Sequence, residues 1–312
     1  MEKRVMGKTG MEVSALGFGG AEIGFENAAA NTVARLLGAA LDAGLNVIDT
    51  AECYRSTTKD DATGETRETA SSESLIGEAV NHRRGDFFLF TKVGHAAGLD
   101  GDDWNPAMMA RSIDRSLQRL QTDCVDLIQL HSCGEDKLRQ GDVIDVLRRA
   151  KQSGKTRFIG YSGDSKDALY AVGCGAFDIL QTSVNIADQE CVDLTIPKAK
   201  AAGMGVIAKR PIANVAWSTG DTPPSNTYRQ SYWERLRKLQ YPFLTSDEAV
   251  ANALRFTLSI PGVCTAIVGT TKPDRWKSNA ALLNNGMLAP AEFDAIRARW
   301  REIAQPDWIG QT

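Results

Sequence analysis

The feature that most constrains the fold of this chain is a pattern that repeats along almost its whole length. A short run of β-branched, aromatic or aliphatic residues is followed by a Gly, Asn or Asp break and then by an amphipathic helix. Eight such runs occur, each followed by a helix or by a stretch long enough to hold one. The predicted strands are residues 15–18, 46–49, 87–92, 124–130, 156–161, 177–183, 205–208 and 265–268.

Eight strand-helix units in about 250 residues are what a closed (β/α)8 TIM barrel requires. Residues 4–14, ahead of the first strand, are predicted to form a β-hairpin turned at Lys8-Thr9-Gly10, which would lie at the barrel floor. The structural alternative is a doubly wound open sheet, which usually carries G-x-G-x-x-G after its first strand. Residues 17–20 lack that spacing. No linker-like composition divides the chain, so we predict one α/β domain over residues 1–312.

Some helix boundaries and loops are also marked. Asn31 is the expected N-cap of the first long helix and Gly44 its stop, and Asn105 with Pro106 should begin a later helix. Three segments lack a regular pattern and are predicted to be loops or tail: residues 55–71, 212–228 and 305–310.

Composition excludes several classes of protein. The 36 Lys and Arg nearly balance the 39 Asp and Glu, which argues against a nucleic-acid or membrane-surface protein. No apolar stretch approaches the roughly 18 residues of a membrane span, and the first residues lack a secretory apolar core. The six cysteines form no C-x-x-C pair and there are three histidines, so we expect reduced, structural thiols and no metal. These features predict a cytoplasmic enzyme.

Four polar residues stand at or just beyond the carboxyl-terminal ends of predicted strands, the rim where barrel enzymes build their active sites. Asp49 and Tyr54 follow the second strand, Lys92 ends the third and His131 follows the fourth. Lys92 ends an apolar run, so it needs a carboxylate partner, and Asp49 on the adjacent strand can supply it. Lys92 would stabilise the anion of Tyr54, while His131 would donate a hydrogen bond to a carbonyl oxygen. This set predicts a Tyr acid that protonates a carbonyl as hydride reaches its carbon.

At these residues the sequence resembles the aldo-keto reductase superfamily over nearly the whole chain. Residues 46–54 are similar to the family's Asp-Thr-Ala-x-x-Tyr segment, and Thr91-Lys92 to its lysine strand. Residues 116–131 match the long family signature that ends in histidine. The resemblance implies NAD(P)H-dependent reduction of aldehydes or ketones, with a tyrosine as the general acid. The catalytic tetrad that it implies is Asp49, Tyr54, Lys92 and His131.

The resemblance also implies a nicotinamide cofactor, with NADP(H) favoured and NAD(H) as the alternative. The fifth and sixth strands end in residues similar to those that hold the carboxamide. The stretch after the eighth strand is similar to the segment that binds the 2′-phosphate and adenine. The candidate cofactor-binding residues are Gly19, Gly20, Ser162, Gly163, Gln181, Lys209, Arg210, Gly269, Thr270, Lys272, Arg275 and Asn279.

Three positions depart from the family pattern. Gly163 stands where many members have Asn, and Gly269 where a lysine is frequent. Lys209-Arg210 replaces a frequent Tyr-Ser pair whose ring stacks on the nicotinamide, so the guanidinium plane of Arg210 is a hypothetical substitute against the cofactor or its pyrophosphate.

The expected partner is a small carbonyl or alcohol substrate, while its identity and the oligomeric state stay open. Two other functions also stay open: a nicotinamide-binding regulatory barrel with little turnover, and a Schiff-base lyase or aldolase in which Lys92 is the nucleophile. His95, in a Gly-rich loop, is assigned no role. The candidate substrate-pocket residues, all aromatic, are Phe25, Trp104, Trp217 and Trp308.

Overall fold

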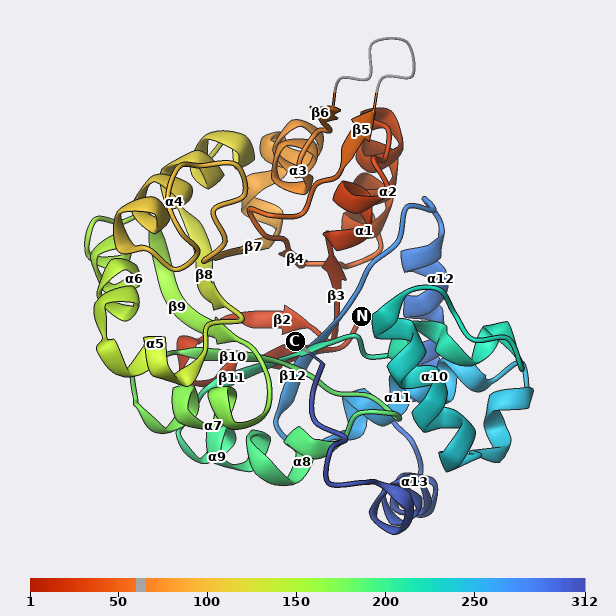
Figure 1. Ribbon diagram of the computed structural model, residues 1–312. Helices are drawn as coiled ribbons and strands as arrows, with labels where there is room; N and C mark the ends of the chain where they lie inside the picture. The colour runs from red at the N-terminus through yellow and green to blue at the C-terminus, as the bar shows by residue number, and fades with distance from the viewer. Residues whose placement is uncertain (60–65, 312) are drawn as a thin grey trace.

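The computed structural model describes residues 1–59 and 66–311 and contains the predicted closed barrel of eight parallel strands (Figure 1). The strands follow one another around the barrel in chain order, so each pairs with its neighbours in sequence. This confirms the predicted fold class. The barrel strands are β3 (Leu16–Gly19), β4 (Val47–Asp49), β7 (Phe88–Val93), β8 (Val125–His131), β9 (Thr156–Ser162), β10 (Ile179–Ser183), β11 (Gly205–Lys209) and β12 (Val263–Val268).

Helices form a ring around this barrel, as Figure 1 shows in a view down its centre. The α-helices are α1 (Ala21–Phe25), α2 (Ala30–Asp42), α3 (Ser72–Val80), α4 (Pro106–Leu120), α5 (Glu135–Gln140), α6 (Asp142–Gln152), α7 (Ser165–Gly173), α8 (Glu190–Leu194), α9 (Ile196–Ala201), α10 (Thr227–Leu239), α11 (Ala249–Ser259), α12 (Arg275–Ala281) and α13 (Pro290–Ile303). Shorter 3-10 turns are η1 (Gly7–Thr9), η2 (Asn81–Asp86), η3 (Ala213–Thr219), η4 (Pro242–Thr245) and η5 (Leu282–Asn285). Within the described part of the chain, no helix is long and apolar enough to cross a membrane.

The predicted N-terminal hairpin is present and closes the amino-terminal end of the barrel. The main-chain N–H of Lys8 donates to the carbonyl of Gly203, which lies just before β11 (2.8 Å). Met6 and Met11 are buried and pack in one apolar cluster with barrel residues such as Phe90. The barrel floor is therefore filled by side chains. The strands of the hairpin are β1 (Lys3–Val5) and β2 (Glu12–Ser14), which pair antiparallel.

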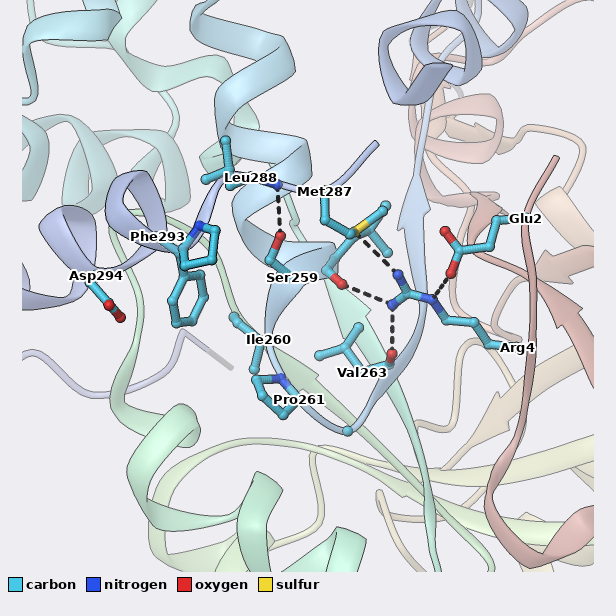
Figure 2. Close-up of a pocket in the computed structure, with 13 residues that line it drawn as sticks. Glu2, Arg4, Ser259, Ile260, Pro261, Val263, Met287, Leu288, Phe293 and Asp294 are labelled. Carbon is cyan, nitrogen blue, oxygen red and sulfur yellow. Dashed lines mark hydrogen bonds and ion pairs between the residues drawn. The ribbon is translucent and has the colours of Figure 1, made fainter. Parts of the chain in front are cut away.

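Arg4 fastens this hairpin to the rest of the molecule. Its guanidinium donates to the carbonyl oxygens of Leu258 and Val263, each at 2.9 Å, and pairs with Glu2 (Figure 2). These residues belong to a hollow between the hairpin, the end of α11 and the start of α13. Because Val263 is the first residue of β12, the hollow lies at the amino-terminal end of the strands, opposite the rim where the tetrad was predicted.

One helix boundary differs from the prediction and another agrees with it. Ala29, not Asn31, is the N-cap of α2, because the chain turns into the helix from an extended Ala29 whose carbonyl accepts the first main-chain bonds. Asn31 lies inside the first turn, while Gly44 follows the end of the helix as predicted. Asn105 caps α4, where its side chain accepts the N–H of Ala107 (3.0 Å).

The segment 55–71 is not only a loop. It holds a short antiparallel pair, β5 (Thr57–Lys59) and β6 (Thr66–Glu68), and residues 60–65 of the predicted loop lie outside the described residues. Its threonines suit a strand although they are polar. The second predicted loop, 212–228, includes the turn η3 and the first residues of α10.

Candidate active site

Lys92 is the centre of a polar cluster at the carboxyl-terminal rim of the barrel. Its ammonium donates to Asp49 Oδ1, to the carbonyl of Thr50 (2.8 Å) and to the hydroxyl of Tyr54 (3.3 Å). The side chains of Lys92 and Asp49 are each only 1% exposed, so this is a fully buried ion pair. An ammonium has three donor hydrogens, and all three have acceptors here.

Strand alternation explains why these charges face one another. Successive side chains of a barrel strand point alternately into the barrel and toward the helices. In β7, Phe90 packs in the cluster inside the barrel, so Lys92, two residues further on, faces inward as well. In β4, Val47 and Asp49 share the inward face in the same way. The apolar floor thus gives way to charged residues at the rim.

The second oxygen of Asp49 links this ion pair to the residues predicted to hold a carboxamide. Asp49 Oδ2 accepts hydrogen bonds from Gln181 (2.9 Å) and from Gln129 (3.1 Å). Gln181 in turn accepts the hydroxyl of Ser162 (3.1 Å). Sequence reasoning missed Gln129. Its position in the strand two residues before His131, on the same inward face, was the signal that could have found it.

Tyr54 and His131 complete the cluster. Their rings lie 5.8 Å apart in an edge-on arrangement, and the ammonium of Lys92 lies 4.9 Å from the centre of the Tyr54 ring. Both Tyr54 and His131 are half-buried, so each is partly accessible to solvent, whereas Lys92 is not. The structure therefore brings the four predicted tetrad residues together.

The surroundings shift the proton affinities of three of these groups. Burial opposes the charge of Lys92, but the adjacent Asp49 carboxylate and Tyr54 raise the pKa of Lys92 above its ordinary value. Burial raises the pKa of Tyr54 to about 12, only partly offset by Lys92. This is opposite to the net lowering expected from the sequence, because desolvation outweighs the cation. Burial and then Lys92 lower the pKa of His131 well below its ordinary value, which leaves a neutral imidazole.

The glycines predicted to approach a cofactor lie beside the tetrad. Gly19 is the register partner of Asp49, and the N–H of Gly20 donates to the Asp49 carbonyl (2.7 Å). At Gly163, a Cβ would lie 2.5 Å from the hydroxyl of Tyr161. An Asn at this position would therefore require Tyr161 to move.

The stretch after β12 mixes buried and exposed polar groups. Thr270 and Asn279 are buried, whereas Lys272 and Arg275 are exposed to solvent. The hydroxyl of Thr270 accepts the main-chain N–H of Lys272 (3.0 Å), and α12 begins at Arg275. Three exposed cations, Lys272, Arg275 and Lys277, and two buried polar groups thus gather within eleven residues, from 269 to 279.

Gly269 marks a residue that the sequence did not single out. A Cβ at Gly269 would lie 1.5 Å from a carboxylate oxygen of Glu22, so no lysine can stand there while Glu22 keeps its place. Glu22 lies in α1, directly after the first barrel strand. Burial raises the pKa of Glu22.

Two other predicted cofactor residues are engaged inside the protein. Lys209 forms an ion pair with the buried Asp164 (2.8 Å). Arg210 donates to the hydroxyl of Ser183 (2.8 Å) and to the carbonyl of Gln311, and its guanidinium lies 4.6 Å over the ring of Tyr228. The guanidinium plane of Arg210 thus lies over an aromatic ring of α10, and its contact with a cofactor stays a prediction.

The four candidate pocket aromatics separate into two groups. Phe25 is 52% exposed and lies 5.3 Å from the Tyr54 ring, and the indole N–H of Trp104 donates to the carbonyl of His131 (3.0 Å). Trp217 is half-buried in η3. Trp308 packs in the core with its ring 5.5 Å from Trp300. The structure thus brings Phe25 and Trp104 to the tetrad and places Trp308 in the packing of the tail.

His95 also lies at the rim, although no role was predicted for it. Its ring is 5.0 Å from His131 and 5.2 Å from Trp104, and its Nδ1 lies 2.9 Å from Asp103. Its main-chain N–H donates to Glu52 (2.9 Å). The position of His95 three residues after Lys92, at the carboxyl end of a strand, was the available signal.

The protein is a closed parallel barrel whose rim brings a phenol next to a buried Lys-Asp ion pair and a neutral imidazole. Such a site is typical of a barrel enzyme that transfers a proton away from bulk solvent. Comparison with known sequences identifies the group. The chain belongs to the aldo/keto reductase family, whose sequence model matches residues 15–301. It is therefore an oxidoreductase of a family whose members act on small-molecule carbonyl substrates.

Individual relatives are similar along nearly their whole length. L-galactose dehydrogenase of Arabidopsis thaliana is 29% identical, over 100% of this chain and 99% of the relative. The uncharacterized oxidoreductase YqkF of Bacillus subtilis is 25% identical, over 97% of each chain. Among solved structures, the holo form of aldo-keto reductase AKR11C1 from Bacillus halodurans has a TM-score of 0.80 and 25% identity, over 99% of each chain.

Proposed function

We propose that this protein is an NAD(P)H-dependent reductase that reversibly converts aldehydes or ketones to alcohols, with Tyr54 as the general acid. The observation that carries the proposal is the contact of one buried ammonium, on Lys92, with both Asp49 and the Tyr54 hydroxyl. That contact couples a phenol to a permanent cation in a site from which water is largely excluded.

Each side chain has a separate part in this chemistry. Tyr54 gives its proton to the carbonyl oxygen, and Lys92 stabilises the phenolate that remains. The neutral imidazole of His131 orients the same oxygen by a hydrogen bond, and Asp49 keeps Lys92 charged and in place. Bound NAD(P)H would supply the hydride that reaches the carbonyl carbon.

The residues present fit a nicotinamide cofactor. Gln181 donates to Asp49, and Ser162 donates to Gln181, so an amide and a hydroxyl lie beside the tetrad, which suits a carboxamide. Lys272 and Arg275 are exposed cations after β12, and with the buried Thr270 and Asn279 they suit the 2′-phosphate of NADP(H), so NADP(H) is the favoured cofactor.

The contacts of Lys92 also bear on the lyase alternative. A Schiff-base nucleophile must be a neutral amine, but the Asp49 carboxylate raises the pKa of Lys92. The ammonium is therefore held in the form that cannot attack a carbonyl. The geometry favours an orienting cation over a nucleophile.

The test is spectrophotometric. The oxidation of NADPH and of NADH is followed with aliphatic aldehydes, aromatic aldehydes, ketones and sugars. In the oxidative direction L-galactose is tested as a substrate, because the relative in Arabidopsis thaliana is an L-galactose dehydrogenase. We expect carbonyl-dependent consumption of the reduced cofactor, faster with NADPH. Cofactor binding, seen as quenching of tryptophan fluorescence, without turnover of any carbonyl would overturn the proposal in favour of the regulatory barrel.

A further inference from the structure

Three side chains with metal-ligating atoms converge beside the tetrad. Glu52, Cys53 and His131 each offer one ligand atom, and these atoms all lie within 4.8 Å of one another. The Sγ of Cys53 is 3.7 Å from Nδ1 of His131. The proposed reduction assigns no part to Glu52 or to Cys53.

One carboxylate oxygen of Glu52 has no hydrogen-bond partner among the described residues. Glu52 is 0% exposed, and its Oε1 accepts the main-chain N–H of His95 (2.9 Å). Its Oε2 is buried with no hydrogen-bond partner among the described residues. A buried, unsatisfied carboxylate oxygen is costly, and native proteins seldom keep one without a role. A cation is the partner that such an oxygen suits best.

We propose that Glu52, Cys53 and His131 bind a zinc-class divalent cation, and that the bound cation inhibits carbonyl reduction. The ligand types match, since zinc takes thiolate, imidazole and carboxylate in a tetrahedral site. Tetrahedral zinc holds a sulfur and a nitrogen ligand about 3.5 Å apart, which is close to the distance found. The fourth position is left for water.

The two anionic ligands counter the positive charge of the neighbouring Lys92, and the position at the rim gives access. When the cation binds, the proton of the Cys53 thiol and any proton on Glu52 are released to solvent, and the resulting thiolate and carboxylate then neutralise the divalent charge. Cys53 and His131 are half-buried at the rim, whereas Glu52 is buried beneath them. The cation can therefore arrive through the mouth and be retained below it.

Inhibition follows from the ligand that the two functions share. A cation on Nδ1 fixes the ring of His131 toward Cys53 and adds positive charge next to Tyr54, whose ring lies 5.8 Å from that imidazole. The cation and its water also occupy the space beside His131 and Tyr54 in which the carbonyl oxygen would have to align. The inhibition of carbonyl reduction rests on the proposed function, whereas binding of the cation does not. The sequence predicts no metal, and the proposed cation departs from that expectation.

The first experiment measures binding without any substrate. Co²⁺ is titrated into the full-length protein and the thiolate-to-cobalt charge-transfer absorption is recorded, followed by displacement with Zn²⁺. We expect a band typical of tetrahedral cobalt-thiolate ligation that Zn²⁺ removes. Cys53→Ser should abolish the band, and Glu52→Gln should weaken the apparent affinity at least about tenfold. Circular dichroism verifies that both variants are folded.

Cys124→Ser is the matched control. Cys124 is also half-buried, but it precedes β8 at the opposite end of the barrel and its thiol contacts the carbonyl of Val125 (3.4 Å). The control should keep the cobalt band. The absence of a band in the parent protein, or a band that persists in Cys53→Ser, would overturn the metal site whether or not the protein reduces carbonyls.

The second experiment concerns inhibition. Carbonyl-dependent oxidation of NADPH is measured with increasing Zn²⁺, and each variant is compared with its own rate in the presence of a chelator. The parent protein and Cys124→Ser should lose activity over the Zn²⁺ range in which cobalt is displaced, and Cys53→Ser should not. Full activity at saturating Zn²⁺ would overturn the inhibitory role.

Discussion

At the scale of single residues, the site depends on one buried cation with three acceptors. Burying an ammonium is costly, and Asp49 offsets that cost because both side chains are withdrawn from water together. Lys92 is then available to Tyr54 as a fixed positive charge. Removing the Tyr54 hydroxyl should therefore lower activity, whereas removing the Lys92 ammonium should lower both activity and stability.

Replacing Tyr54 by Phe removes the acidic hydroxyl and keeps the ring. We expect kcat for carbonyl reduction to fall roughly 10²- to 10⁴-fold, since this is the usual contribution of a positioned acid. Cofactor affinity, measured by fluorescence quenching, should stay within a few-fold. Turnover equal to that of the parent protein would show that another group delivers the proton.

Lys92→Met should lower both activity and stability. It leaves Asp49 as a buried charge without its cation, and breaking such a pair costs about 3–5 kcal/mol. Urea denaturation followed by circular dichroism measures this loss. The double variant Lys92→Met with Asp49→Asn should recover much of the stability and none of the activity; equal stabilities of the single and double variants would contradict a buried ion pair.

The residues of the tetrad were predictable because each ends or follows a strand in a pattern that the chain repeats. Their proton affinities were not. The sequence places a lysine near Tyr54, but the degree of burial, which raises the pKa of Tyr54 to about 12, depends on packing from distant segments. Gln129 and Glu22 were missed for a similar reason, since a polar residue in a strand or a short helix shows its contacts only after the barrel closes.

At the scale of elements, the strands were predicted well because each is a compact apolar run between helices. Caps were less predictable, as α2 shows: main-chain geometry at Ala29 begins the helix although Asn31 is the better capping residue by type. The pair β5 and β6 was missed because its residues are polar, and polar threonines occur in both loops and exposed strands. The hairpin at the start of the chain was predicted, and its attachment can be tested.

Arg4→Ala should loosen this hairpin. The partly buried guanidinium of Arg4 satisfies two carbonyl oxygens, at Leu258 and Val263 (Figure 2), and losing such bonds costs about 1–3 kcal/mol. Thermal and urea unfolding should report this loss while kcat stays unchanged, because the hollow lies opposite the tetrad. Arg83→Ala is the control. Arg83 makes only exposed ion pairs with Asp42 and Asp86, so a change near zero is expected.

At the scale of the whole molecule, a buried carboxyl group away from the tetrad makes the free energy of unfolding depend on pH. Asp188 is 0% exposed, its Oδ1 has no partner in the described part of the chain, and the hydroxyl of Tyr232 donates to its Oδ2 (3.2 Å). Burial raises the pKa of Asp188 to about 8, with the negative charge of Asp164 adding to the rise and Arg235, 3.9 Å away, opposing it. The folded protein therefore holds a proton that the unfolded chain releases.

Asp188→Asn tests this linkage. Between about pH 4 and pH 8 only the folded state keeps the proton, so the contribution of Asp188 to the free energy of unfolding should fall as pH rises, by at most about 1.4 kcal/mol per unit. Asp188→Asn removes this contribution, and the difference between the two proteins should level off above pH 8. Urea denaturation from pH 5 to pH 9 measures both curves; parallel curves would mean that Asp188 is ionised in the folded protein.

The side chains that fill the amino-terminal end of the barrel restrict which molecules can react. Since Met6, Met11 and the barrel side chains packed against them fill the interior, a reactant can reach the tetrad only from the carboxyl-terminal rim, with its C=O group leading. Whatever trails behind that group stays outside, among the surface loops. Branching on the carbon next to the C=O should therefore slow the reaction sharply, whereas lengthening the trailing end should matter little.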